Sequence, residues 1–207
     1  DGHGDNKISQ DCFFLEPVSI ENLHSSMSTR NFWCIVEGEE MPWSAFGYSV
    51  YQQARRHTAG EEKAWLAAGP YWQEVKRTCP ENGLKAAILS FCPVGEEKAE
   101  IMKVTLENTG KKAITLTPVA AIPIFARGAD HIRDHRHVTS LLNRISVTDD
   151  GVVVTPSMAF DERGHHKNDV SYGVYGRDEL GGKPVGAVPT VEDFIGDGGN
   201  YMAPAAV

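Results

Sequence analysis

The chain has 207 residues and a mass of 22.7 kDa, and its 41% apolar, 9% aromatic and 23% charged residues are ordinary for a globular protein. Its 28 acidic residues outnumber its 20 basic ones, and the net charge of −8 disfavours a basic surface that binds nucleic acid or an anionic membrane. No apolar segment reaches the roughly 18 residues that a membrane helix needs. We therefore expect a single domain over residues 1–207.

The cysteines indicate a reducing compartment. The four of them, at positions 12, 34, 79 and 92, are too few for a disulfide scaffold and include no C-x-x-C pair to hold a metal. No signal peptide is visible, and the chain starts at Asp1 rather than Met. These features favour a cytoplasmic protein and a chain that is a fragment of a longer one.

Glycine and proline punctuate the whole chain, and the short segments between them alternate in polarity, which predicts strands joined by turns. In the first part of the chain we expect strands over 31–36, 47–53 and 71–78. Residues 60–68 are one of only two segments able to hold a few helical turns, the other lying within 129–144.

The middle of the chain carries the clearest strand pattern. Residues 83–91 are apolar on both faces, as in a strand buried between two layers. Residues 101–107 and 114–117 alternate between apolar and polar, with a turn between them. This pattern predicts a hairpin in which Gly110 supplies a positive φ, so that three consecutive antiparallel strands follow one another.

Two further strands are expected at 151–155 and 170–175, and the tail over 176–199 is too rich in glycine and proline for a regular element. The close spacing of the strands and the scarcity of helix predict an all-β fold, an antiparallel sandwich or barrel with few short helices.

The segment 127–137 does not fit a plain sandwich, because it carries three Arg, two Asp and three His in an otherwise acidic chain. Guanidinium groups fork onto phosphate, carboxylate or vicinal hydroxyls, and Asp and neutral His accept hydrogen bonds from hydroxyls. The mixture therefore suits a sugar or a phosphate. Salt bridges that pin a surface loop are one alternative. A metal site on His131, His135 and His137 is another, although the neighbouring arginines would repel a divalent cation.

Aromatic residues offer a second possible sugar site, since the apolar face of a pyranose packs on an aromatic ring. Core packing is the favoured interpretation, because most of these rings lie on or beside predicted strands. The residues concerned are Trp33, Trp43, Trp65, Trp72, Tyr48, Tyr51 and Tyr71.

Two other polar stretches give weaker signals. His165 and His166, among charged neighbours and next to Gly164, are interpreted as an exposed turn rather than a polar site. The glycine-rich string 196–199 lacks the Lys and Ser or Thr of a phosphate loop, and we do not expect it to open a helix.

The run PIFARGADHIRDHRHVTSLL over residues 123–142 resembles the N-terminal domain of glycoside phosphorylases of the cellobiose and chitobiose phosphorylase type, glycoside hydrolase family 94, formerly glycosyltransferase family 36. Shorter stretches agree in order, and the resemblance covers about residues 30–200. These stretches are Arg30–Trp33, Met41–Ser44, Asn82–Lys85, Phe91–Gly95, Val104–Thr109 and Asp193–Gly196.

The resemblance implies a galactose-mutarotase-like β-supersandwich that precedes an (α/α)6 catalytic barrel. Family members cleave a β-glucosidic bond with inversion by attack of inorganic phosphate, so they need one carboxylic acid and no carboxylate base. That acid belongs to the barrel, which this chain is too short to contain. We therefore expect no catalytic residue here, no cofactor besides phosphate as co-substrate of the parent enzyme, and an inactive isolated domain.

The resemblance also implies a role for the charged segment, because the matching loop crosses a dimer interface and approaches the acceptor end of the neighbouring active site. The expected partners are a β-linked oligosaccharide, the chain's own barrel and a second copy in a homodimer. A free-standing carbohydrate-binding module is the alternative function, and a metal-dependent enzyme is a further rival. The candidate substrate-binding residues are Arg127, Gly128, Asp130, Arg133, Asp134, His135 and Arg136.

Overall fold

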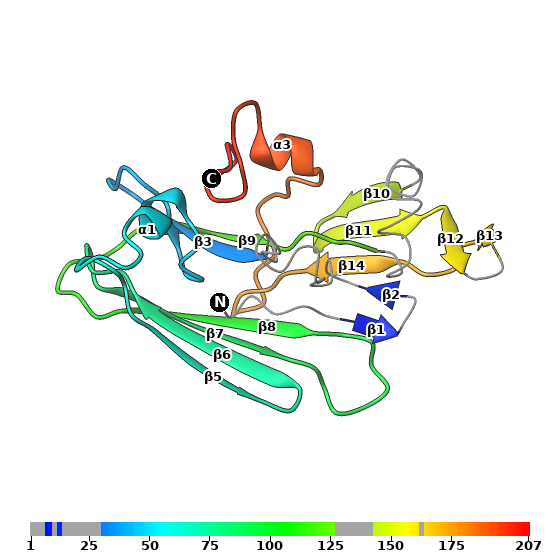
Figure 1. Ribbon diagram of the computed structural model, residues 1–207, viewed down its shortest axis with the longest axis horizontal. Coiled ribbons are helices and arrows are strands. Elements are labelled where there is room, and N and C mark those ends of the chain that lie inside the picture. The colour runs from blue at the N-terminus through cyan, green and yellow to red at the C-terminus, as the bar shows by residue number, and fades with distance from the viewer. Residues whose placement is uncertain (1–6, 10–11, 14–29, 127–142, 162–163) are drawn as a thin grey trace.

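The computed structural model describes residues 7–9, 12–13, 30–126, 143–161 and 164–207, and its regular elements are mostly strands (Figure 1). Every strand pairing within this part of the chain is antiparallel. Two short helices accompany the strands in the described segments. The all-β antiparallel fold expected from the sequence is therefore confirmed.

Two sheets from the first part of the chain lie face to face as a sandwich, with a shared apolar core between them (Figure 1). The first sheet has the order β4-β3-β9 and comprises β3 (Asn31–Val36), β4 (Trp43–Ser44) and β9 (Leu116–Ala121). The second has the order β5-β6-β7-β8 and comprises β5 (Ala64–Gly69), β6 (Trp72–Thr78), β7 (Leu84–Phe91) and β8 (Ile101–Asn108).

The sandwich core is formed by alternate side chains that point inward. β3 is buried along nearly its whole length, and Phe32, Cys34 and Val36 on one of its faces belong to the shared core. On β7, Leu84, Ala86 and Ile88 are buried, whereas the residues between them are only half-buried. β7 is therefore covered on one face, not on both as its apolar composition predicted. Partly buried side chains of β8 pack against the same core, as the alternation predicts: Met102, Val104 and Leu106.

The remaining strands form smaller sheets, which Figure 1 shows to the right of the sandwich. Val154 and Tyr172, from two strands of one of these sheets, are buried together with Ala126. The strands are β10 (Asn143–Thr148), β11 (Gly151–Pro156) and β14 (Tyr172–Tyr175) in one sheet, β12 (Met158–Asp161) with β13 (Gly164–Lys167), and β1 (Lys7–Ser9) with β2 (Cys12–Phe13).

The predicted hairpin over residues 101–117 is wrong. β8 pairs with β7, whereas β9 pairs with β3 in the opposite sheet, so the connection between β8 and β9 crosses from one layer to the other. Gly110 is not among the glycines with positive φ in the described chain. A Cβ at Gly110 would lie 2.9 Å from the carbonyl oxygen of Asn82, so the position requires space and not a left-handed backbone.

Both described helices lie outside the segments predicted to be helical. Helix α1 (Val50–Ala54) replaces the strand expected over 47–53, because the Ser49 side chain caps it by accepting a hydrogen bond from the Gln52 amide. Residues 64–68, part of the segment 60–68 that was predicted to be able to hold a few helical turns, belong to strand β5 instead, which pairs along its whole length with β6. Helix α3 (Val191–Ile195), capped by Thr190, lies in the tail that was expected to be irregular.

Candidate functional site

The charged segment predicted to bind substrate lies outside the described residues. This applies to Arg127, Gly128, Asp130, Arg133, Asp134, His135 and Arg136, and to the alternative metal ligands His131 and His137. The candidate site is therefore built from other residues. None of the helices in the described segments is long and apolar enough to cross a membrane.

The aromatic residues that were assigned to the core divide into a buried and an exposed set. Trp33 and Trp43, on the paired strands β3 and β4, are buried, as predicted. Trp65, Trp72 and Tyr71, by contrast, keep 50%, 41% and 75% of their surface exposed. The core assignment is wrong for these three, which gather on or beside strands β5 and β6.

Trp65 and Trp72 lie on the same outer face of the four-stranded sheet. Trp65 pairs with Lys76, and Trp72 lies four positions before Lys76 on β6, so all three side chains project to one side. The Lys76 ammonium lies 4.3 Å from the centre of the Trp65 ring, which agrees with this placement. Val75 points the opposite way and is 3% exposed in the core. The two indoles therefore stand on the side turned away from the sandwich.

On strand β5 the side chains that face outward between the two tryptophans are small. Four positions along β6 correspond to roughly 13 Å at about 3.3 Å per strand residue. On β5 the intervening outward positions are Ala67 and Gly69, and on β7 the residue opposite Lys76 is Ala87. A Cβ at Gly69 would lie 2.5 Å from Trp72 Nε1, so the indole lies directly over the glycine. Between these two rows Glu74 on β6 and Leu89 on β7 also face outward, so small residues lie between the two tryptophans only along β5.

Further apolar side chains extend this surface across the sheet. Phe91 lies opposite Trp72, and Ile101 lies opposite Phe91, so the three form a row over β6, β7 and β8. Tyr71 lies in the turn that precedes β6 and has a φ of 65°, an uncommon conformation for a bulky residue. We call the outward-facing set Trp65, Ala67, Gly69, Trp72, Phe91 and Ile101, together with the exposed Tyr71 in the adjoining turn, the aromatic face.

Charged side chains beside the aromatic face largely neutralise one another. Lys76 Nζ lies 3.0 Å from Glu74 Oε2 on the same strand, and Lys85 Nζ lies 3.0 Å from Glu107 Oε2 on the neighbouring strand. Lys103, opposite Leu89, adds one more positive charge on this side. The surface therefore has no strong charge of either sign, which suits a neutral ligand better than an ionic one.

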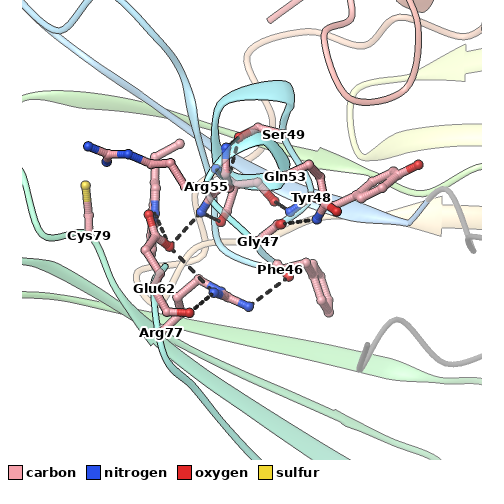
Figure 2. A network of polar contacts seen from close by, with 12 residues as sticks. Phe46, Gly47, Tyr48, Ser49, Gln53, Arg55, Glu62, Arg77 and Cys79 are labelled. Carbon is pink, nitrogen blue, oxygen red and sulfur yellow. Dashed lines mark hydrogen bonds and ion pairs between the residues drawn. The ribbon is translucent and has the colours of Figure 1, made fainter. Parts of the chain in front are cut away.

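The inner side of the same sheet holds a buried polar network, shown in Figure 2. The Glu62 side chain is 5% exposed, and its carboxylate accepts hydrogen bonds from Trp43 Nε1 at 3.2 Å and from Gln52 Nε2 at 2.7 Å. Arg77 Nη1 lies 3.6 Å from Glu62 Oε2 and donates to the Glu62 carbonyl at 3.2 Å. The network joins the start of β5 to β4, α1 and β6.

Arg77 completes this network by crossing between the layers. Its Nη2 donates to the Phe46 carbonyl at 3.4 Å, and a Cβ at Gly47 would lie 2.4 Å from the guanidinium carbon, so the glycine makes room for it (Figure 2). Burial lowers the pKa of Arg77, and the neighbouring Glu62 opposes that shift. Within the described chain Arg77 Nε has no hydrogen-bond partner, but the Glu62 carboxylate and both terminal nitrogens of the guanidinium have partners in the network. We therefore interpret the network as a structural tie between the sheets.

An open depression of about 580 Å³ lies beside the network, and charged side chains line part of it. Glu81 accepts hydrogen bonds there from Arg55 at 2.8 Å and from Tyr51 at 3.0 Å. Partial burial disfavours ionisation of Glu81, but hydrogen bonds from Cys79, Tyr51 and Arg55 outweigh it and lower its pKa. Because Glu81, Arg55 and Tyr51 are paired with one another, we interpret their contacts as structural.

The two weaker signals from the sequence have structural explanations. His165 and His166 lie in β13, which pairs with β12, so they belong to a β-hairpin and not to a turn as expected. The glycine string does not open a helix, as predicted; Gly196 follows α3 with a φ of 69° and terminates it.

Comparison with known proteins assigns no family to the chain: no protein-family model matches it, and no curated protein matches it. The candidate site therefore depends on the geometry of the aromatic face. One signal in the sequence does point to it, because Trp72 alternates in phase with Glu74 and Lys76 and out of phase with Val75. That phase places Trp72 on the same face of β6 as Glu74 and Lys76, opposite Val75.

Proposed function

We propose that the chain is the non-catalytic N-terminal sandwich domain of an inverting β-glucoside phosphorylase. The parent enzyme would use phosphate to cleave a β-linked gluco-oligosaccharide and release an α-sugar 1-phosphate and a shortened acceptor. The catalytic acid would come from a barrel that follows this domain. The domain would contribute contacts in a homodimer and an acceptor-side loop over residues 127–137.

The observation that carries this proposal is the antiparallel sandwich, together with where the resembling stretches lie in it. Arg30–Trp33 and Met41–Ser44 include paired residues of β3 and β4, since Trp33 lies opposite Ser44. Val104–Thr109 lies largely on β8, and Asp193–Gly196 spans the end of α3. Several stretches that resemble one family in sequence thus lie on strands of a sandwich, the architecture that the resemblance implies.

Phosphorolysis of cellobiose and related β-linked disaccharides tests the proposal. The full-length parent should release sugar 1-phosphate only when inorganic phosphate is present, whereas this chain alone should release none because it lacks the acid. A parent without phosphate-dependent cleavage, or an isolated chain that cleaves, contradicts the proposal.

The loop has a separate test in the synthetic direction. In the parent enzyme, Arg133→Ala or His135→Ala should mainly raise the KM for the acceptor, because both remove groups that can bind sugar hydroxyls. Lys98→Ala, a charge removal at an exposed position outside the loop, serves as the matched control. Acceptor kinetics that are the same in all three variants would assign the loop to surface salt bridges instead.

A free-standing carbohydrate-binding module is the second candidate, and the exposure of Trp65, Trp72 and Tyr71 favours it. The two candidates differ in the domain expected downstream of this chain in its gene. A barrel that bears the catalytic Asp after Val207 supports the phosphorylase domain, whereas an unrelated or absent downstream domain supports the binding module.

A further inference from the structure

We infer that the aromatic face of the four-stranded sheet is a binding surface for a neutral, extended β-linked glucan. The site is separate from the loop over residues 127–137. Its use of β-linked glucose as ligand rests on the proposed function, whereas the stacking surface itself rests on the geometry of β5 and β6.

Exposure is the first step of the argument. A soluble domain gains free energy when it buries indole rings, yet Trp65 and Trp72 remain about half-exposed, while Trp33 and Trp43 are buried. Tyr71 is the most exposed of the aromatic set and occupies a left-handed turn position where glycine or asparagine is the ordinary choice. Two indoles exposed on one face of the sheet, with an exposed tyrosine in the adjoining turn, indicate a recognition surface.

The shape of the surface is the second step. Trp65 and Trp72 are separated by roughly 13 Å along the strands, more than the length of one sugar ring. Ala67 and Gly69 lie between them on β5, so a path of small residues joins the two rings along that strand, and the paired Glu74 and Lys76 border it on β6. A chain of several sugars can therefore lie across both indoles. β-Linked glucose suits this surface because its ring hydroxyls are equatorial, which leaves flat apolar faces for stacking.

Charge and polarity are the third step. The paired Lys76 and Glu74 neutralise each other but keep their polar groups beside the rings, where hydroxyls of a sugar can exchange hydrogen bonds with them. Thr105 lies opposite Ala87 and adds a hydroxyl on the same face. An anionic polymer would find only the single extra lysine, Lys103. The complement of this surface is therefore an uncharged polyhydroxylated chain.

The test measures binding of the 207-residue chain to cellohexaose and laminarihexaose by calorimetry, and to hydroxyethyl cellulose by affinity electrophoresis. Trp72→Ala and Trp65→Ala should each weaken binding about tenfold or more, because each removes one stacking ring. Trp72→Phe should retain most of the affinity. Tyr175→Ala removes an exposed aromatic side chain from the other part of the molecule and should leave binding unchanged.

Fluorescence gives an independent readout that does not depend on variants. Trp33 and Trp43 are buried, so acrylamide should quench mainly Trp65 and Trp72, and a bound glucan should reduce that quenching. A glucan that leaves the quenching unchanged, or affinity that is equal in Trp72→Ala and Tyr175→Ala, overturns the inference.

Other occupants of the surface produce different results. If sedimentation shows a dimer that Trp72→Ala abolishes while no glucan binds, the face is a contact between copies and the inference is wrong. Failure of the proposed function is measured separately, by the phosphorolysis assay. If the parent binds glucan but does not phosphorolyse it, this inference holds and the proposed function is wrong. If the parent phosphorolyses but this surface binds no glucan, the proposed function holds and this inference is wrong.

Discussion

The two faces of the four-stranded sheet use the same kinds of side chain for opposite purposes. On the inner face the Glu62 carboxylate is paired with Trp43, Gln52 and Arg77, and the Arg77 guanidinium also reaches the Phe46 carbonyl. On the outer face Lys76 and Glu74 pair with each other near solvent, and Trp65 and Trp72 remain exposed. The comparison teaches that the neighbours of a side chain, and not its residue type, distinguish the buried structural face of this sheet from the exposed candidate binding face.

The difference has an energetic cause. A buried carboxylate loses its hydration and must recover that free energy from several hydrogen bonds. Loss of any of these hydrogen-bond partners therefore destabilises the folded state. An exposed ion pair keeps most of its hydration and contributes little to stability. Substitutions on the inner face should therefore change the free energy of unfolding, whereas those on the outer face should change binding.

The largest expected effect comes from breaking the buried network. Glu62→Ala should lower the free energy of unfolding by about 3–5 kcal/mol, because it leaves Arg77 buried without its carboxylate. Urea unfolding followed by circular dichroism measures the change. Glu61→Ala, at the adjacent exposed position, should cost less than about 1 kcal/mol. Equal losses in the two variants would show that the network does not tie the sheets together.

Adjacent residues of β7 sharpen the comparison within one strand. Ile88 is 1% exposed and faces the core, whereas Leu89 faces outward and is half-buried. Ile88→Ala should destabilise the chain by about 2–5 kcal/mol, since it leaves a cavity. Leu89→Ala should cost about 1 kcal/mol or less. A larger loss at Leu89 in the same urea titration would mean that the outer face is itself a packed interface.

The smallest effect near neutral pH is expected from the buried thiols. Burial raises the pKa of Cys34 and of Cys79 from 9.0 to about 12. Well below pH 9 both thiols are protonated in the folded and unfolded chains, so they add no pH dependence. As the pH rises from about 9 towards 12 the unfolded chain releases these protons first, so stability should fall.

Unfolding measured from about pH 7 to about pH 10.5 checks the thiol prediction. The double variant Cys34→Ala and Cys79→Ala should lose part of the decline above about pH 9, whereas Cys92→Ala, at a half-buried thiol, should lose less of it. An unchanged decline in the double variant would assign the alkaline loss of stability to other groups.

Local patterns in the sequence predicted some elements well. The strand expected over 31–36 has the same bounds as β3, because its apolar run needs both faces covered. The strand expected over 83–91 and the one starting at residue 101 pair as β7 and β8. The helix α1 was missed, since the cap that Ser49 provides outweighs a short alternating pattern.

Long-range relations could not be predicted in the same way. The alternation of residues 114–117 is compatible with either sheet, and only packing places β9 beside β3. Trp65 lies in a segment that was predicted to be able to hold a few helical turns, and its side chain was assigned to the core, because nothing local to it reveals that β6 is the partner of its strand. The charged segment that carries the family resemblance lies outside the described residues, so its expected role stays a prediction.

The amino-acid sequence by itself determined that this protein is built from antiparallel strands, because alternating polarity and frequent turn residues are local properties of the chain. Only the tertiary structure decided which side of the four-stranded sheet is buried. Alternation assigns Trp72 and Val75 to opposite faces, but the neighbour that covers one of those faces comes from β3, far away along the chain. Burial depends on such contacts between distant residues. The same contacts therefore decide which tryptophans lie in the core and which remain exposed.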